Sequence, residues 1–465
     1  MTPQPSRSAD QPAPSRGEPR ELTLAVGAPA HGGHCVARPV DDPGGRVIFV
    51  RHALPGETVR ARLTEMTSRT WRADAVEILQ ASPDRVESVW PEAGPAGVGG
   101  GELAHVALDA QRTWKRWVLA DCLRRIGGQE VADAVAALPE ASAAAAVPIE
   151  PMPTDAAAQA SNSARRRALA GTSTRTRVSL TVGEDGRPGM HAFRSGTVLP
   201  LRRLPLAVDA ITEIGLLERS RWRAHYRPGM RIEAIAPSGG EPVVLLDERL
   251  LTAQARSTGR RRVREVVDAS ALGLGELTYS VHAEGFWQVH VDAPRVLVER
   301  VVRGALGADL DGAAGSRVLE LYSGAGLFTL PLAALVSSSG EVVSLEGNEQ
   351  AVRDARRTLH DQPSARLASG RVSARSVREL AGSLTGGRPD VVILDPPRQG
   401  AGREVIEAVG ALGAERIVLV ACDPAALARD LGTLLRSGYA LGSMSALDMF
   451  PHTHHFETIA VLERS

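Results

Sequence analysis

The clearest hydrophobic pattern in the chain is an apolar run that stops at a glycine turn and continues as an apolar helical segment. Residues 318–321 form the run, and Gly324 and Gly326 lie in the turn. A strand, a tight turn and a helix in this order predict the first unit of a doubly wound α/β domain. Further apolar runs at 342–345, 391–394 and 417–420 alternate with helical segments. This rhythm predicts a mostly parallel sheet within residues 277–465.

The first part of the chain has a different pattern. Residues 1–19 are rich in Pro and Ser and are predicted to be a disordered tail. Short alternating runs at 22–26, 47–50, 59–63 and 73–79 are separated by Gly and Pro turns. They predict a small β-barrel over residues 20–82. Such a barrel serves either RNA binding or oligomerisation.

Residues 83–276 are predicted to form a central α+β domain. A loop rich in Pro and Gly is followed by apolar residues near helical spacing from Leu103 to Ile126, with a glycine pair as the stop. Runs at 177–182 and 243–246 have β character. The basic clusters 165–167 and 260–262 fit phosphate contacts or solvated faces equally well.

Composition narrows the class of protein only a little. The 465 residues carry no formal net charge, which neither indicates nor excludes nucleic acid. The three cysteines are widely spaced and do not form a disulfide framework. No leader pattern and no long apolar run is present, so we expect a cytoplasmic protein with no membrane contact.

A carboxylate lies at the expected distance from the glycine turn. Glu346 ends the next apolar run, twenty residues after Gly326. A carboxylate in this position is suited to bind the hydroxyls of a ribose. The turn lacks the third glycine of a dinucleotide fingerprint, which favours S-adenosylmethionine over NAD. The alternative is that Gly324 and Gly326 serve packing alone.

Polar side chains follow four of the predicted strands. Tyr322, Glu346, Asp395 and Cys422 stand at these strand ends, where ligands gather in open α/β sheets. Cys422 is the candidate nucleophile, and the helix that begins near Pro424 is expected to lower its pKa. A purely structural cysteine is the alternative.

Five stretches together resemble the RNA uracil-C5 methyltransferase family, which includes the bacterial tRNA and 23S rRNA 5-methyluridine enzymes. The barrel region resembles the RNA-binding TRAM domain. The stretches are Gly285–His290, Leu321–Pro331, Leu394–Ala401, Ala421–Leu431 and Asp448–Glu457. The resemblance implies a Rossmann-like class I S-adenosylmethionine-dependent methyltransferase domain behind a TRAM or OB-like barrel. It also implies methylation of uridine C5 in structured RNA, either rRNA or tRNA.

The same resemblance assigns roles to residues. Cys422 would be the nucleophile that adds to C6 of uracil, and Glu457 the base that removes the C5 proton, with Asp395 beside them. The residues that would bind S-adenosylmethionine or frame its site are Gln288, Tyr322, Gly324, Gly326, Glu346 and Asp395. An ordinary edge-strand carboxylate is the alternative for Glu457.

Some positions depart from the family pattern. Certain members hold an iron–sulfur cluster on four cysteines, but Trp90, Val98, Gly101 and Leu204 stand at the corresponding positions here. Because such clusters require thiolates, we expect no iron–sulfur cluster and no other metal. His290 and Asp423 each replace a frequent Asn and bear on substrate choice.

Two other classes of function remain open from the sequence. One is a non-catalytic RNA-binding or folding factor that kept the scaffold. The other is methylation of a different substrate, such as cytosine C5 or a small molecule. A methyltransferase is favoured because Gln288, Asp395, Cys422 and Glu457 are all present. A monomer is expected, and the target uridine is not predicted.

Overall fold

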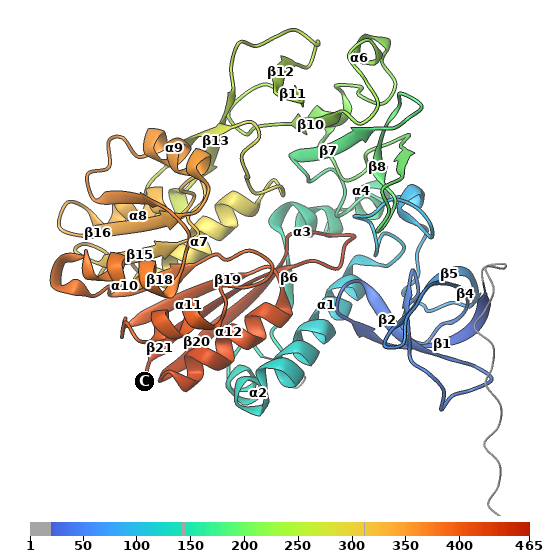
Figure 1. Cartoon of the computed structure of the whole chain (residues 1–465), viewed down its shortest axis with the longest axis horizontal. Helices are drawn as coiled ribbons and strands as arrows, with labels where there is room; N and C mark the ends of the chain where they lie inside the picture. The colour runs from blue at the N-terminus through green and yellow to red at the C-terminus, as the bar shows by residue number, and fades with distance from the viewer. Residues whose placement is uncertain (1–19, 142–145, 311) are drawn as a thin grey trace, which may run out of the picture. The chain divides into compact units, whose positions relative to one another are not determined.

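The computed structural model describes residues 20–141, 146–310 and 312–465 (Figure 1). The chain divides into two compact units. The first comprises the residues up to Ala30 together with His34–Pro83, and the second comprises His31–Gly33 together with Asp84–Ser465. The predicted tail, residues 1–19, lies outside the described residues.

The first unit is a closed barrel with the strand order β1-β2-β3-β5-β4. The predicted barrel is therefore confirmed, although the apolar pattern had not indicated β2. Alternating side chains such as Leu24, Ile48 and Val59 are fully buried and fill its interior. The strands are β1 (Glu21–Ala30), β2 (His34–Pro39), β3 (Ile48–Arg51), β4 (Thr58–Met66) and β5 (Trp71–Gln80).

The second unit is built on a mixed sheet with the order β17-β16-β15-β18-β19-β21-β20-β6. The pairs from β17 to β19 are parallel, whereas β21 is antiparallel to both of its neighbours. The predicted parallel α/β sheet is confirmed. The strands are β6 (Ile149–Pro151), β15 (Arg317–Leu321), β16 (Glu341–Glu346), β17 (Ala365–Ser369), β18 (Val391–Leu394), β19 (Arg416–Ala421), β20 (Tyr439–Asp448) and β21 (Glu457–Arg464).

Both faces of this sheet are covered by helices. Successive strand residues pack into different cores: Val318 belongs to one and Leu319 to the other. The first core lies under α7 (Ala293–Leu306), α8 (Thr329–Val336) and α9 (Glu349–Thr358). The second lies under α1 (Leu108–Cys122), α2 (Gln129–Ala136), α10 (Ala374–Gly382), α11 (Arg403–Gly410) and α12 (Pro424–Arg436) (Figure 1). None of the helices in the described residues is long and apolar enough to cross a membrane.

Part of the predicted central region packs with the mixed sheet of the second unit. β6 pairs with β20, and Leu119 of α1 and Val135 of α2 are buried in the core of that sheet. The weak pattern of residues 132–160 had given no sign of this strand. The division at residues 83 and 277 stays a prediction.

A second, antiparallel sheet has the order β12-β11-β10-β7-β8-β9. Its strands are β7 (Arg177–Val182), β8 (Pro188–His191), β9 (Val198–Pro200), β10 (Arg231–Ile235), β11 (Val243–Leu246) and β12 (Arg249–Thr252). β13 (Arg262–Asp268) and β14 (Glu276–His282) form a separate two-stranded hairpin, which is followed along the chain by α7. Short helices are α3 (Pro153–Gln159), α4 (Ala164–Ala168), α5 (Asp209–Thr212), α6 (Ser220–Arg223), η1 (Pro91–Ala93), η2 (Leu123–Gly127), η3 (Ser270–Leu272) and η4 (Thr385–Gly387).

The positions compared with cluster cysteines lie in the core of this antiparallel sheet. Trp90, Val98 and Leu204 are buried in one apolar cluster. A Cβ at Gly101 would come within 2.9 Å of the Trp90 ring and 2.7 Å of the Ala93 side chain. Apolar packing with a large indole therefore fills the space around these positions.

This close approach predicts that Gly101→Ala destabilises the protein. The added methyl group must push against Trp90 and Ala93, which overpacks the core and costs about 1–3 kcal/mol. Gly196→Ala is the matched control, because a Cβ at Gly196 meets no atom within 4 Å. Urea unfolding followed by circular dichroism measures both. Equal unfolding midpoints for the two variants would contradict the packing described here.

Candidate functional site

Four strand ends bring polar side chains to one edge of the parallel sheet. Tyr322 follows β15, Glu346 ends β16, Asp395 follows β18 and Cys422 follows β19. β15 lies between β16 and β18, so the strand order reverses at this point. Doubly wound folds bind their ligands at such a reversal, beyond the carboxyl ends of the strands.

A cavity of about 960 Å³ opens at this edge. The structure brings seven of the eight predicted site residues into its lining: Gln288, Tyr322, Gly324, Glu346, Asp395, Cys422 and Glu457. Gly326 is the exception. It has a φ of +87°, and a Cβ there would lie 3.4 Å from the Ala355 side chain of α9. Gly326 therefore lies against α9, and its role in cofactor binding stays a prediction.

The glycine turn and the spaced carboxylate are joined directly. The backbone N–H of Gly324 donates to Glu346 Oε2 at 2.9 Å, and the N–H of Asn348 donates to Oε1 at 2.6 Å. Each carboxylate oxygen keeps a free lone pair, because one oxygen can accept two hydrogen bonds. Glu346 is thus held rigidly at the cavity and can still accept hydrogen bonds from a ligand.

Tyr322 has a strained backbone at the start of this turn. Its φ is +64°, in the left-handed region that non-glycine residues rarely adopt. Its N–H donates to Leu345 O at 2.8 Å, which ties the strained residue to β16. Strain held in place by the surrounding structure is common at ligand sites. Burial raises the pKa of Tyr322 to about 12, so its hydroxyl stays a donor at neutral pH.

Glu457 enters the cavity from the interior of the sheet. It is the first residue of β21, which lies between β19 and β20. The alternative of an ordinary edge-strand carboxylate is therefore wrong. The residue is only 6% exposed, and within the described structure its Oε1 has no hydrogen-bond partner. A buried oxygen left open in this way is available to a ligand or to a transferred proton.

Three acidic groups share this buried space, and both burial and neighbouring carboxylates raise their pKa values. Burial and then Glu346 raise the pKa of Asp395 to about 7. Burial and then Asp395 raise the pKa of Glu457 well above its usual value. Burial, Glu457 and Asp395 raise the pKa of Cys422 to about 12. The cavity therefore keeps the Cys422 thiol protonated at neutral pH in the free protein.

The prediction that a helix lowers the pKa of Cys422 is wrong, because this pKa is raised. The helix α12 does begin at Pro424, but Asp423 caps it and accepts hydrogen bonds from the N–H groups of Ala425 and Ala426. Burial and the two carboxylates outweigh any effect of the helix on the thiol. The motif identified the cysteine but did not reveal its surroundings.

Arg398 and His455 were not assigned to the site from the sequence. Both line the cavity with Cys422, and Arg398 Nη2 donates to His455 Nε2 at 3.3 Å. Burial lowers the pKa of His455 to about 3, so the ring is neutral and accepts this bond. Arg398 in turn lowers the pKa values of Cys422 and Glu457. Its place directly after Asp395-Pro-Pro was the only available signal.

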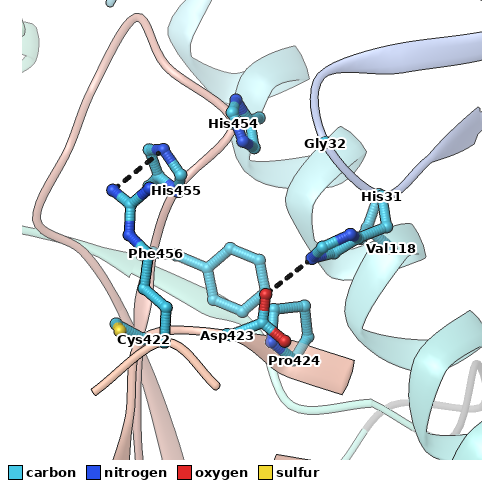
Figure 2. A pocket seen from close by; sticks show the side chains of 10 residues that line it. His31, Gly32, Val118, Cys422, Asp423, Pro424, His454, His455 and Phe456 are labelled. Carbon is cyan, nitrogen blue, oxygen red and sulfur yellow. Dashed lines mark hydrogen bonds and ion pairs between the residues drawn. The ribbon is translucent and has the colours of Figure 1, made fainter. Parts of the chain in front are cut away.

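A smaller pocket of about 140 Å³ also reaches Cys422 (Figure 2). Arg398, Cys422 and His455 line both this pocket and the large cavity. His31, which belongs to the second unit, bonds Asp423 at 2.8 Å on its wall. The bond to Asp423 raises the pKa of His31. Asp423, one of the residues that depart from the family pattern, is therefore held both by His31 and by the helix that it caps.

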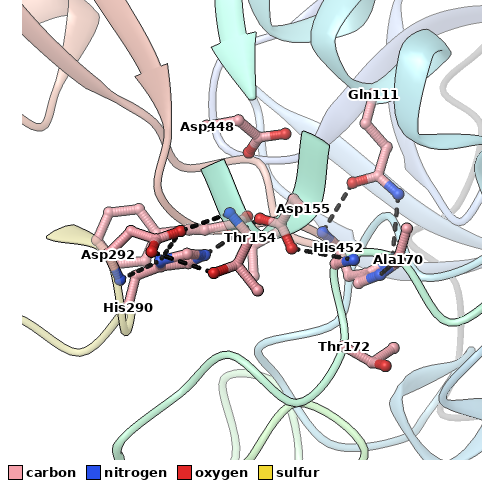
Figure 3. Close-up of polar contacts among 12 residues, drawn as sticks. Gln111, Thr154, Asp155, Ala170, Thr172, His290, Asp292, Asp448 and His452 are labelled. Atoms are coloured by element: carbon pink, nitrogen blue, oxygen red, sulfur yellow. Dashed lines mark hydrogen bonds and ion pairs between the residues drawn. The ribbon is translucent and has the colours of Figure 1, made fainter. Parts of the chain in front are cut away.

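His290, the other departure, is buried and belongs to a group of polar contacts with Asp155 and Asp292 (Figure 3). Its Nδ1 accepts a hydrogen bond from the N–H of Asp292, so Nε2 carries the proton and faces Asp155 Oδ2 at 3.1 Å. It does not belong to the lining of either pocket. Its effect on substrate choice stays a prediction.

The histidines of the loop before Glu457 do not form a metal site within the described residues. In residues 20–141, 146–310 and 312–465, no group of three or more His, Cys, Asp or Glu side chains is arranged to hold a metal ion. The ring centroids of His454 and His455 lie 3.9 Å apart, and His454 Nδ1 lies 3.6 Å from Glu102 Oε2. The absence of an iron–sulfur cluster stays a prediction.

Two family descriptions match separate parts of the chain. Residues 275–465 match "tRNA (Uracil-5-)-methyltransferase", and residues 18–76 match the TRAM domain. The second match agrees with the closed barrel and the first with the parallel sheet. The barrel and the methyltransferase domain predicted from the sequence are thus both confirmed.

Relatives and one solved structure extend along nearly the whole chain. An uncharacterized RNA methyltransferase of Streptomyces avermitilis is 38% identical and covers 95% of this chain and 98% of its own length. A 23S rRNA (uracil(1939)-C(5))-methyltransferase RlmD of Acinetobacter baumannii is 30% identical and covers 94% and 92%. The crystal structure of Pyrococcus abyssi tRNA (uracil-54, C5)-methyltransferase with S-adenosyl-L-homocysteine shares the fold, with a TM-score of 0.62, 20% identity and coverage of 94% and 99%. The chain belongs to the RNA uracil-C5 methyltransferase family.

Proposed function

We propose that this protein methylates C5 of a uridine in structured RNA through a temporary covalent bond between Cys422 and C6 of the base. The observation that carries the proposal is the meeting of Cys422, Glu457 and Asp395 at one cavity, beside the glycine turn and Glu346. The three groups come from different strands. Packing for stability alone would not require three acidic groups at one buried point.

The residues of the large cavity fit S-adenosylmethionine. Glu346 has free lone pairs for ribose hydroxyls, and a Cβ at Gly324 would stand in open space, so the turn leaves room for a ligand. Apolar walls from Leu327 and Phe328 suit an adenine ring, and Asp395 suits a cationic group. S-adenosylmethionine supplies an electrophilic methyl group on a sulfonium.

Cys422 makes uracil reactive enough to take that methyl group. Addition of the thiolate to C6 pushes the ring electrons towards the carbonyl oxygen and leaves C5 nucleophilic. After methylation C5 still carries its proton. Glu457 takes this proton, the C5–C6 double bond forms again, and the bond between C6 and sulfur breaks. Cys422 is thereby restored.

The raised pKa values fit this order of events. A carboxylate with a raised pKa is a stronger base, which suits Glu457 for removing a proton from carbon. The thiol of Cys422 must lose its proton before it can attack, and the cation of Arg398 favours that loss. Arg398 therefore favours formation of the Cys422 thiolate through its positive charge.

RNA is the proposed substrate class because a TRAM domain precedes the methyltransferase domain. A uridine must leave its base stack to reach a cavity of this kind. The named relatives act on different RNAs, one on 23S rRNA and one on tRNA, so either remains a candidate here. Action as a monomer in the cytoplasm stays a prediction.

The first experiment measures methyl transfer directly. Purified protein is incubated with labelled S-adenosylmethionine and with unmodified tRNA or 23S rRNA transcripts, followed by nucleoside mass spectrometry. We expect labelled 5-methyluridine from the wild type and none from Cys422→Ala. Because the thiol lies outside the ribose-binding part of the cavity, the variant should still bind S-adenosylmethionine in calorimetry.

Two other outcomes would redirect the proposal. Binding of RNA and S-adenosylmethionine without methyl transfer would favour a non-catalytic RNA-binding or folding factor. A labelled nucleoside other than 5-methyluridine would favour a different substrate, such as cytosine. Either result would overturn methylation of uridine C5.

Removing the base should separate the two halves of the reaction. In Glu457→Gln, Cys422 can still add to C6, but the C5 proton has no acceptor and the covalent bond persists. We expect turnover to fall about 10²- to 10⁴-fold. A protein–RNA species that survives denaturing electrophoresis should accumulate. Normal turnover, or loss of turnover without this species, would contradict the role of Glu457 as the base.

The pH dependence should depend on Arg398. The reaction needs the deprotonated forms of Cys422 and Glu457, whose pKa values are raised, so kcat should rise as the pH is raised from neutral into the alkaline range. Removing a cation that lowers both pKa values raises them further. Arg398→Gln should therefore shift the rising limb to higher pH by about one unit. Arg403→Gln removes the same charge at a helix start, where Arg403 bonds Glu407, and should leave the profile unchanged.

A further inference from the structure

One loop carries three of the groups that line the main cavity. Phe450, His455 and Glu457 all lie in or directly after the connection between β20 and β21, residues 449–456. Connecting loops are normally the more mobile parts of a fold. This loop must nevertheless hold Glu457 and His455 at fixed places beside Cys422.

The start of the loop is held by Lys115, the only lysine in the chain. Its side chain is fully buried in α1, where Nζ donates to Asp448 Oδ1 at 2.5 Å and to the carbonyl of Phe450 at 3.1 Å. Isolated charges are very unfavourable in a protein interior. The ammonium group therefore fixes Asp448, the last residue of β20, and Phe450, which lies in the loop.

The middle of the loop is held by Gln111, four residues earlier on the same face of α1. Its Oε1 accepts the N–H of His452 at 2.7 Å, and its Nε2 donates to His452 Nδ1 at 3.1 Å (Figure 3). His452 has a φ of +66°, which non-glycine residues rarely adopt. Two bonds to one side chain hold this unfavourable conformation in place.

The same contacts continue to the segment that carries Gln288. His452 Nε2 lies 3.3 Å from the carbonyl of Ala170, and the next residue, Gly171, donates its N–H to Asp155 Oδ1 at 3.1 Å. Asp155 also bonds His290, two residues after Gln288. Loop 449–456 and the segment that carries Gln288 are thus both held by hydrogen bonds to buried polar groups. These groups lie outside the parallel strands.

We propose that Gln111 and Lys115 form a clamp, the α1 clamp, that positions loop 449–456 and with it His455 and Glu457 for the reaction. Neither residue lines the large cavity or the small pocket, so they act as positioning residues. The role given to Glu457 rests on the proposed function. The clamp itself is defined by the hydrogen bonds to Asp448, Phe450 and His452.

Kinetics separate positioning from a purely structural role. We expect Lys115→Met and Gln111→Leu each to lower kcat by about 10- to 100-fold, because small misplacements of reacting groups are costly. The KM for S-adenosylmethionine should change less than about threefold, since neither residue touches that part of the cavity. Val135→Ala, which truncates a buried side chain of α2, controls for lost stability.

A double variant separates positioning from stability in a protein whose stability has been restored. In Lys115→Met with Asp448→Leu, no charge is left unpaired, and apolar replacements of buried ion pairs are often well tolerated. We expect the melting temperature to recover while kcat stays low, because the bond to the Phe450 carbonyl is still missing. Recovery of kcat together with the melting temperature would overturn the proposal.

Hydrogen exchange gives a readout that does not depend on activity. Peptides covering 448–457 should exchange faster in Lys115→Met and Gln111→Leu than in the wild type, but not in Val135→Ala. Unchanged exchange in both clamp variants would overturn the proposal, as would normal kcat despite faster exchange. A wild type that methylates no RNA would instead overturn the proposed function, while the exchange data would still report on the clamp.

Discussion

The crowding of three acidic groups into one buried cavity is the constraint on which the rest of the site depends. Burial raises the pKa of Cys422, Asp395 and Glu457, and Asp395 raises the pKa values of Glu457 and Cys422 further. Such an arrangement cannot carry full negative charge at neutral pH. Raised pKa values of this kind fit the proposed order of addition, methylation and elimination at uracil, in which protons move between these groups and the substrate.

The surrounding structure keeps these groups close despite their unfavourable interactions. Parallel pairing of β15, β18 and β19 fixes where Asp395 and Cys422 emerge. Glu457 is the first residue of β21, where it pairs with Leu447 of β20 and directly follows loop 449–456. The buried Lys115–Asp448 pair and the contacts of Gln111 lie where this loop would otherwise be free to move.

Local patterns in the sequence were sufficient to locate much of the fold and the site. Apolar runs such as 391–394 marked the parallel strands, and the residues that follow them meet at the cavity because parallel strands share a carboxyl edge. The barrel was recognised from turns and alternation, although β2 was not. β6 escaped notice because three residues carry too little pattern, and only its pairing with β20 identifies it as part of the sheet.

Properties that arise between distant residues could not be predicted. The pKa of Cys422 is set by burial and by carboxylates from two other strands, so the helix beside it was a misleading guide. The bond between Arg398 and His455 joins residues far apart in the chain, as does the contact of Lys115 with Asp448. Gly326 matched a binding motif, but it lies against α9 and outside the cavity lining. The sequence therefore indicated the candidate reacting groups, whereas their pKa values and their supporting contacts depend on the tertiary structure.

The central claim is that Cys422 forms a covalent bond to C6 of the target uridine. RNA containing 5-fluorouridine tests this most directly, because C5 then carries fluorine and Glu457 has no proton to remove. The account predicts that wild-type protein and S-adenosylmethionine form a stable adduct with this RNA, and that peptide mass spectrometry locates the methylated nucleotide on Cys422. Absence of any adduct with an RNA that the protein methylates, or an adduct on a different residue, would contradict it.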